Sequence, residues 1–98
     1  MVYLVTLNMK VAISRLEIKA QILNILERRG CWGSCQIPKD TIINWLGKKV
    51  LDNGKSVSKV IDDLWQDRLI WYHNKQETIS LNPHRKQEIY DYIDKYIT

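Results

Sequence analysis

The chain has 98 residues, a net charge of +4 and an apolar fraction of 45%. That length suits one domain with one core, residues 1–98, and the apolar fraction argues against intrinsic disorder. No apolar run approaches the ~20 residues that a membrane-spanning helix requires. The first residues also lack the charged region and cleavage site of a secretory signal. We therefore expect an intracellular protein, whose moderate positive charge is consistent with a polyanionic partner.

A first helix is predicted at residues 15–29. Ser14 and Glu17 have the spacing of a capping box, in which each side chain binds the other residue's backbone amide. Apolar residues then recur at helical spacing, and Gly30 is suited to end the helix. Residues 1–13 are rich in β-branched and aromatic side chains, so we interpret them as an extension that forms an extra strand or a dimer contact.

A second helix is predicted to have Pro38 at its first position. Its apolar residues are spaced by four: Ile42, Leu46 and Val50. Two ends are compatible with this pattern, since Gly47 could stop the helix early or the helix could continue through Leu51 to a turn at 53–54. We favour the longer helix because Val50 continues the stripe.

A third helix is predicted at residues 56–69. Ser56 is suited to the N-cap, because its hydroxyl can accept a hydrogen bond from an amide of the first turn. The apolar residues that follow define one face at helical spacing.

A β-hairpin is predicted at residues 70–81, directly after this helix. The period changes to two, which places Ile70 and Tyr72 on one side of the first strand, opposite Trp71 and His73. A polar tip at 74–76 then joins this strand to the returning strand.

The last helix is predicted at residues 82–98, with Asn82 as its cap and Pro83 at its first position. A strong apolar stripe follows on one face: Ile89, Tyr92, Ile93, Tyr96 and Ile97. This stripe can fold back on its own domain or join two copies of the chain, and we expect it to form the interface of a homodimer.

This order of elements resembles the winged helix-turn-helix superfamily, especially small archaeal and bacterial regulators of the MarR and ArsR type. The resemblance is sharpest where SVSKVIDDL, from Ser56 to Leu64, precedes Leu69 and Ile70. It implies an α+β, mainly helical fold with three core helices, a β-hairpin wing and an extra C-terminal helix, with the core at 14–81. It also implies that helix 56–69 enters the major groove of DNA while the wing at 70–81 contacts backbone or minor groove.

The candidate DNA-binding residues are polar or basic and lie on the third helix, on the approach to it or in the hairpin. Lysine can hydrogen-bond guanine, glutamine can bind adenine, and lysines also neutralise phosphates. The set comprises Ser56, Ser58, Lys59, Gln66, Lys48, Lys49, Lys55, His73, Asn74 and Lys75.

Two features depart from the family pattern. Arg68 stands where these families usually place a glycine, and Asp62 and Asp63 lie on the third helix, where they would repel phosphates. We expect these acids to pair with Lys59, Gln66 or Arg68. If both point at the partner surface, the partner is a protein rather than DNA.

Cys31 and Cys35 are compatible with three roles. They could form a disulfide, remain two partly buried thiols, or bind zinc with His73 and His84, which are the only histidines. The CxxxC spacing and the distant histidines are only a weak signal for zinc, so we expect no metal site.

Three tryptophans, Trp45, Trp65 and Trp71, could form a stacking platform for single-stranded nucleic acid. Tryptophans beside apolar helical stripes more often belong to a core or a dimer contact. Trp65 is expected to pack on the wing or another helix, and Trp32, which lies between glycines, is expected to be the most exposed.

No nucleotide-binding loop, metalloprotease motif or catalytic triad spacing occurs in the sequence. We therefore expect no enzyme, no cofactor and no small-molecule substrate. The prediction is a homodimeric, nucleoid-associated regulator that binds double-stranded DNA sequence-specifically. The alternative is a winged-helix module that docks a protein of a replication, transcription or membrane-remodelling assembly.

Overall fold

The computed structural model describes residues 15–48 and 55–97, and they form a small α+β domain. The predicted capping box and extension lie outside these residues. The elements follow in this order: α1 Arg15–Arg28, β1 Ile37–Pro38, α2 Lys39–Gly47, α3 Lys55–Gln66, β2 Ile70–His73, β3 Thr78–Leu81, the 3-10 helix η2 Pro83–Arg85 and α4 Lys86–Ile97. The described residues thus contain four α-helices and three strands, which confirms the predicted mixture of elements.

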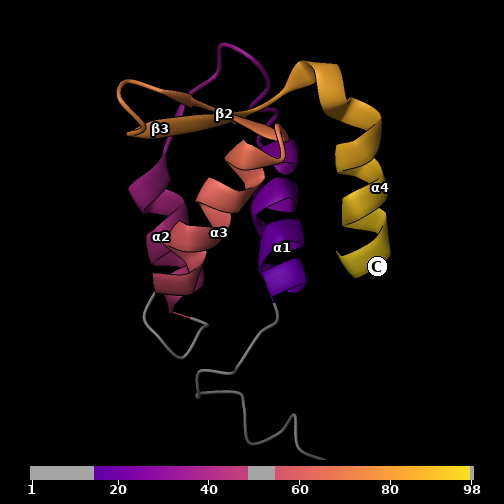
Figure 1. Cartoon of the computed structure of the whole chain (residues 1–98), viewed down its shortest axis with the longest axis horizontal. Coiled ribbons are helices and arrows are strands. Elements are labelled where there is room, and N and C mark those ends of the chain that lie inside the picture. Colours follow the sequence, from indigo (N-terminus) through magenta and orange to yellow (C-terminus); the bar gives the residue numbers. More distant parts are fainter. Residues whose placement is uncertain (1–14, 49–54, 98) are drawn as a thin grey trace, which may run out of the picture.

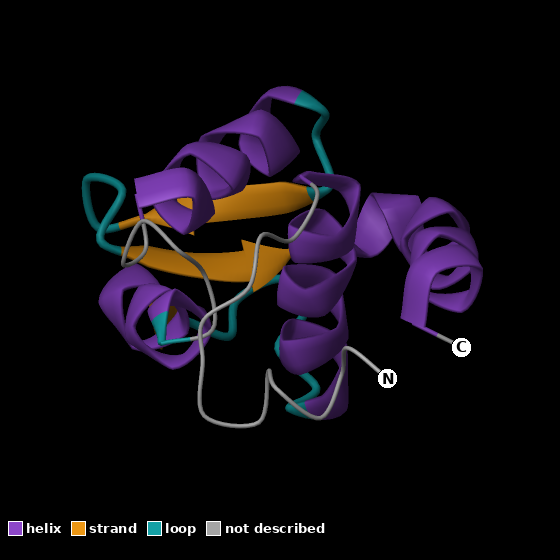
Figure 2. Ribbon diagram, turned by 90° about the horizontal axis from the view of Figure 1, so that it is seen from below, coloured by secondary structure: helices purple, strands orange, loops and turns teal. Residues whose placement is uncertain are grey.

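The three strands form one antiparallel sheet in the order β1-β3-β2. In the hairpin, Ile70 pairs with Leu81 and Tyr72 with Ile79, so the alternation predicted for the first strand is confirmed. Figure 1 shows the sheet edge-on above α1, α2 and α3, and Figure 2 shows that these helices share one of its faces. Helix α4 lies beside α1, on the side away from α2.

One hydrophobic core lies between the sheet and the helices. Every described α-helix and both hairpin strands contribute to it, because each buries one apolar face. The largest fully buried side chains are Ile22, Leu23, Leu26, Ile42, Ile61, Leu64, Ile70, Ile79, Leu81 and Ile89. Within the described residues, no helix is long and apolar enough to cross a membrane.

Two helices end in the same motif, in which a residue with positive φ closes the last turn. After α1, Gly30 has a φ of 63°, and the Cys31 amide donates to the carbonyl of Leu26 at 2.9 Å. After α3, Arg68 has a φ of 65°, and the Leu69 amide donates to the carbonyl of Leu64 at 3.0 Å. These are the bonds of a Schellman motif, which is usually completed by glycine. The predicted role of Gly30 is confirmed.

Some predicted boundaries are wrong. Helix α2 ends at Gly47, and Pro38 belongs to β1 and forms the N-cap position of α2. The longer alternative for this helix is therefore incorrect, and the predicted stop at 53–54 lies outside the described residues. Helix α3 begins at Lys55, which places Ser56 in its first turn rather than at the N-cap.

Candidate nucleic-acid interface

Helix α3 and the hairpin form the candidate interface. Four residues of α3 share its exposed face because they are spaced by four, three and four positions: Lys55, Lys59, Asp62 and Gln66. The opposite face of α3 is fully buried in the core. The helix therefore presents two lysines, an amide and one carboxylate to a partner.

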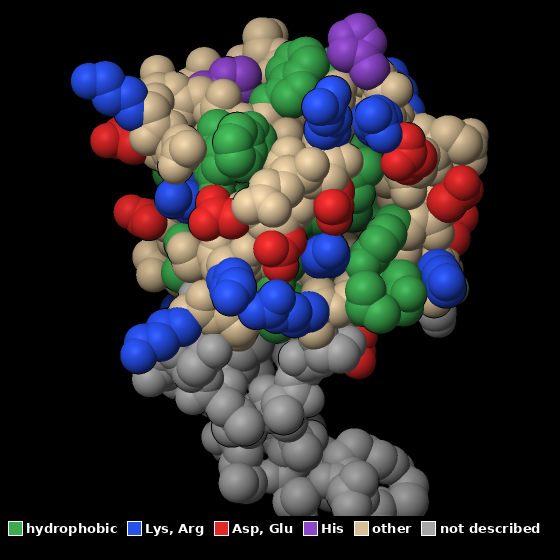
Figure 3. All heavy atoms as spheres, viewed as in Figure 1, with side chains coloured by type: hydrophobic (Ala, Val, Ile, Leu, Met, Phe, Trp, Pro, Cys, Tyr) green, Lys and Arg blue, Asp and Glu red, His purple; other side chains and the backbone are tan. Residues whose placement is uncertain are grey.

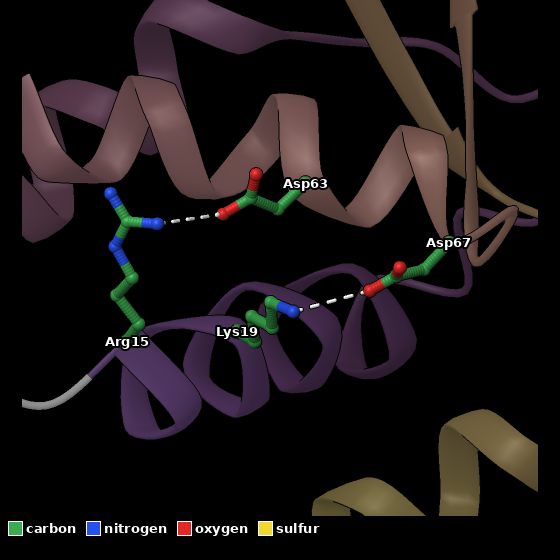
Figure 4. Close-up of polar contacts among 4 residues, drawn as sticks. All are labelled: Arg15, Lys19, Asp63 and Asp67. Atoms are coloured by element: carbon green, nitrogen blue, oxygen red, sulfur yellow. Dashed lines mark hydrogen bonds and ion pairs between the residues drawn. The ribbon is translucent and has the colours of Figure 1, made fainter.

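The three acids near the end of α3 are bound by other parts of the same chain. Arg15 of α1 pairs with Asp63 at 3.4 Å, and Lys19, one turn later, pairs with Asp67 at 3.1 Å. Figure 4 shows the two contacts side by side between α1 and α3. Both pairs are partly exposed, so each contributes little stability, but each neutralises a carboxylate.

Asp62 accepts a hydrogen bond from the phenol of Tyr72 on β2. Burial raises the pKa of Tyr72, and the hydrogen bond to Asp62 and the charge of that carboxylate raise the pKa further. The prediction that Asp62 and Asp63 pair with Lys59, Gln66 or Arg68 is therefore wrong. The acids contact Tyr72 and Arg15 instead, because β2 and α1 flank α3.

The basic candidates in the described residues are exposed: Lys48, Lys55, Lys59 and Lys75. Within the described parts of the chain, none of them forms an ion pair. Lys49 lies outside those parts. In Figure 3, blue and red side chains alternate over α1 and α3, and blue side chains gather where α2 ends and α3 begins. Lys48 and Lys55 thus lie at the end of the face where α3 begins, and Lys75 lies at the hairpin tip.

Two of the hairpin candidates have internal roles. The ring of His73 shares a hydrogen bond with the hydroxyl of Ser80 at 2.9 Å, and that hydroxyl donates to the carbonyl of Gly33 at 2.7 Å. The amide of Asn74 donates to the side chain of Gln36 at 2.6 Å. Both residues hold the hairpin to the segment after α1, and Lys75 is the remaining hairpin candidate for a ligand contact.

The hairpin tip has an unusual backbone. Three consecutive residues have positive φ, at 50° for Asn74, 55° for Lys75 and 70° for Gln76. The amide of Glu77 closes the tip on the carbonyl of His73 at 3.1 Å. Asparagine tolerates this conformation, whereas lysine and glutamine adopt it at a cost. The backbone thus holds Lys75 at the end of the hairpin.

An aromatic surface beside α3 was only partly predicted. Trp65 is 45% exposed, and its ring lies 5.6 Å from that of Tyr72, which confirms that it packs on the hairpin. Lys39, at the start of α2, lies 5.4 Å above the Tyr72 ring. Sequence reasoning misses Lys39, because the position of this lysine depends on the pairing of β1 with β3. Trp32 packs against Tyr90 and is not the most exposed tryptophan, contrary to the prediction.

Cys31 and Cys35 are joined by a disulfide. This is one of the three predicted alternatives. No group of three histidine, cysteine or acidic side chains in the described residues could hold a metal ion. The disulfide lies in the segment between α1 and β1, which also carries the partners of the hairpin, Gly33 and Gln36.

The predicted dimer stripe on α4 is largely used inside the domain. Ile89 and Ile93 are buried, and Tyr92 and Ile97 pack against the same core. The ring centres of Tyr96 and Tyr92 lie 4.9 Å apart. The stripe packs on α1, which is the alternative considered from the sequence. Ile89 and Ile93 are therefore not accessible to a second copy.

Comparison with known proteins provides no relative: no family model, curated protein or solved structure matches this chain significantly.

Proposed function

We propose that this domain is a winged helix-turn-helix that binds double-stranded DNA, with α3 in the major groove and the β2–β3 hairpin as the wing. The observation that carries the proposal is which charged side chains of α3, and of the residue that follows it, are bound within the chain. Asp62, Asp63 and Asp67 are bound within the chain, whereas Lys55 and Lys59 have no acidic partner in the described residues. The helix can therefore approach phosphates despite its acids.

The arrangement of elements supports the same function. A helix of 12 residues with one buried and one exposed face is followed after three residues by a hairpin, and β1 adds a third strand. An α-helix fits the major groove of B-DNA, and a wing beside it reaches the backbone or the minor groove. In this arrangement Lys59 and Gln66 contact bases, while Lys48, Lys55 and Lys75 contact phosphates. Ser56 and Ser58, on the first turns, complete the set.

Salt titration of DNA binding tests the proposal. Binding to a random duplex should weaken as salt increases, because lysines that contact phosphates displace counterions. Replacing Lys55 or Lys75 by alanine should reduce the slope of log affinity against log salt by about one unit each. Gln66→Ala should leave that slope unchanged and alter the preference among selected duplexes.

The matched control is Lys95→Ala, which removes the same charge from α4, away from α3 and the hairpin. Its DNA affinity should change little. If Lys95→Ala and Lys55→Ala lower the DNA affinity equally, DNA is attracted only by the net charge of the protein. Absence of salt-sensitive binding at low ionic strength would refute the proposal.

A protein-docking module is the second candidate, because Trp65 is 45% exposed next to Tyr72. Exposed tryptophan is typical of the centre of a protein interface. If Trp65→Ala or Asp62→Ala abolishes binding to the partner while Lys59→Ala and Lys75→Ala leave that binding intact, the partner is a protein.

A further inference from the structure

A basic furrow lies between α1 and α2. It has a volume of about 330 Å³ and is lined by Ile25, Arg28, Arg29 and Trp45. Its lining residues belong to α1, to the residue that follows α1 and to α2, whereas the proposed DNA interface is centred on α3 and the hairpin. None of the lysines of α3 lines the furrow.

The furrow combines an aromatic wall with unpaired cations. Trp45 is 37% exposed, and the guanidinium of Arg29 lies 4.3 Å from the centre of its ring. No acid lines the furrow, and neither Arg28 nor Arg29 forms an ion pair within the described residues. Such a surface fits a segment that carries carboxylates and an aromatic anchor.

The outward face of α4 has this chemistry. Because the apolar stripe of α4 packs on α1, its opposite side faces outward. Three residues lie three, four and seven positions after Gln87 and share that side of the helix with it: Tyr90, Asp91 and Asp94. Tyr90 is 40% exposed, and both acids are exposed. This face therefore carries two exposed carboxylates around an aromatic ring, and Asp91 also accepts a hydrogen bond from the side-chain amide of Gln87 at 2.9 Å.

We infer that the furrow binds the outward face of α4 from a second copy of the chain. Tyr90 of one copy meets Trp45 of the other, and Asp91 and Asp94 meet Arg28 and Arg29. Charge complementarity between two exposed surfaces of the same chain carries this inference. Because each copy carries both surfaces, a dimer that forms the contact twice is isologous.

Sedimentation velocity on paired charge reversals tests the contact. The unmodified chain should associate as its concentration rises. The furrow variant R28E/R29E should self-associate at least about tenfold more weakly, and so should the helix variant D91K/D94K, because each leaves like charges facing one another. An equal mixture of the two variants should associate again, since every contact in a mixed dimer joins opposite charges.

A matched control separates the contact from net charge. K55E/K59E changes the total charge by the same amount as R28E/R29E, but on α3, and its self-association should remain that of the unmodified chain. Thermal unfolding of each variant confirms that it is folded. A chain that stays monomeric at every concentration would overturn the inference, as would a dimer that survives R28E/R29E or a mixture that fails to associate. None of these results depends on DNA, so the inference and the proposed function fail separately.

Discussion

The side-chain amide of Asn82 donates a hydrogen bond to the backbone carbonyl of Arg68 at 2.7 Å, and so ties the start of η2 to the end of α3. The oxygen of the same side chain accepts from the amide of His84 at 2.9 Å. Asn82 is only 7% exposed, so water cannot easily replace either bond. One side chain thus fixes both the entry to the hairpin and the exit from it.

Replacing Asn82 by alanine should lower the free energy of unfolding by about 1–3 kcal/mol, because it removes two part-buried hydrogen bonds to the backbone. Chemical denaturation measures this loss. The control is Asn44→Ala on the exposed side of α2, which should change stability by less than about 0.5 kcal/mol. Equal effects at both positions would show that the bonds of Asn82 contribute nothing specific.

Replacing Arg68 by glycine should stabilise the protein by up to about 1 kcal/mol. Arg68 has a φ of 65°, which costs a side-chain-bearing residue about 1–2 kcal/mol, and the greater freedom of glycine in the unfolded chain offsets part of the gain. Arg68→Ala removes the same charge but keeps the penalty, so the difference between the two variants in chemical denaturation isolates the backbone effect. If alanine stabilises as much as glycine, the gain comes from the charge.

The comparison of Arg68 with Asp63 shows what the sequence can predict. The sequence alone shows that Arg68 stands where a glycine is expected, because a helix end depends on residues that are neighbours in the chain. The apolar periods of α1, α3 and α4 can be predicted for the same reason. The partner of Asp63 is Arg15, 48 residues away, and the sequence alone does not show which helices lie side by side. The internal roles of His73 and Asn74 were missed likewise, since they depend on the segment after α1.

Reduction of the disulfide between Cys31 and Cys35 should destabilise the domain by about 2 kcal/mol, the loop-entropy value for so short a closed loop. Thermal unfolding with and without a dithiol measures the change. Cys35→Ser is the control, because the dithiol should have no further effect on a variant that cannot form the bond. A dithiol effect that persists in Cys35→Ser would mean that it acts elsewhere, and no effect on the unmodified chain would contradict the prediction.

Stability should decline in alkali, and Tyr72→Phe should weaken this decline. Burial, the hydrogen bond to Asp62 and the charge of Asp62 all raise the pKa of Tyr72 above the ordinary tyrosine value of 10.0. Above that pH the unfolded chain releases the phenolic proton while the folded chain retains it, so each further rise in pH favours unfolding. Below that pH both states are protonated, and the contribution of the shifted pKa is constant.

Chemical denaturation on both sides of pH 10 measures the slope of stability against pH. Asn44→Ala, at an exposed position of α2, removes no titrating group, so it is the control and should leave the slope unchanged. If Tyr72→Phe retains the full alkaline slope, the hydrogen bond between Tyr72 and Asp62 does not hold the phenol protonated, and Asp62 is left free to repel phosphates.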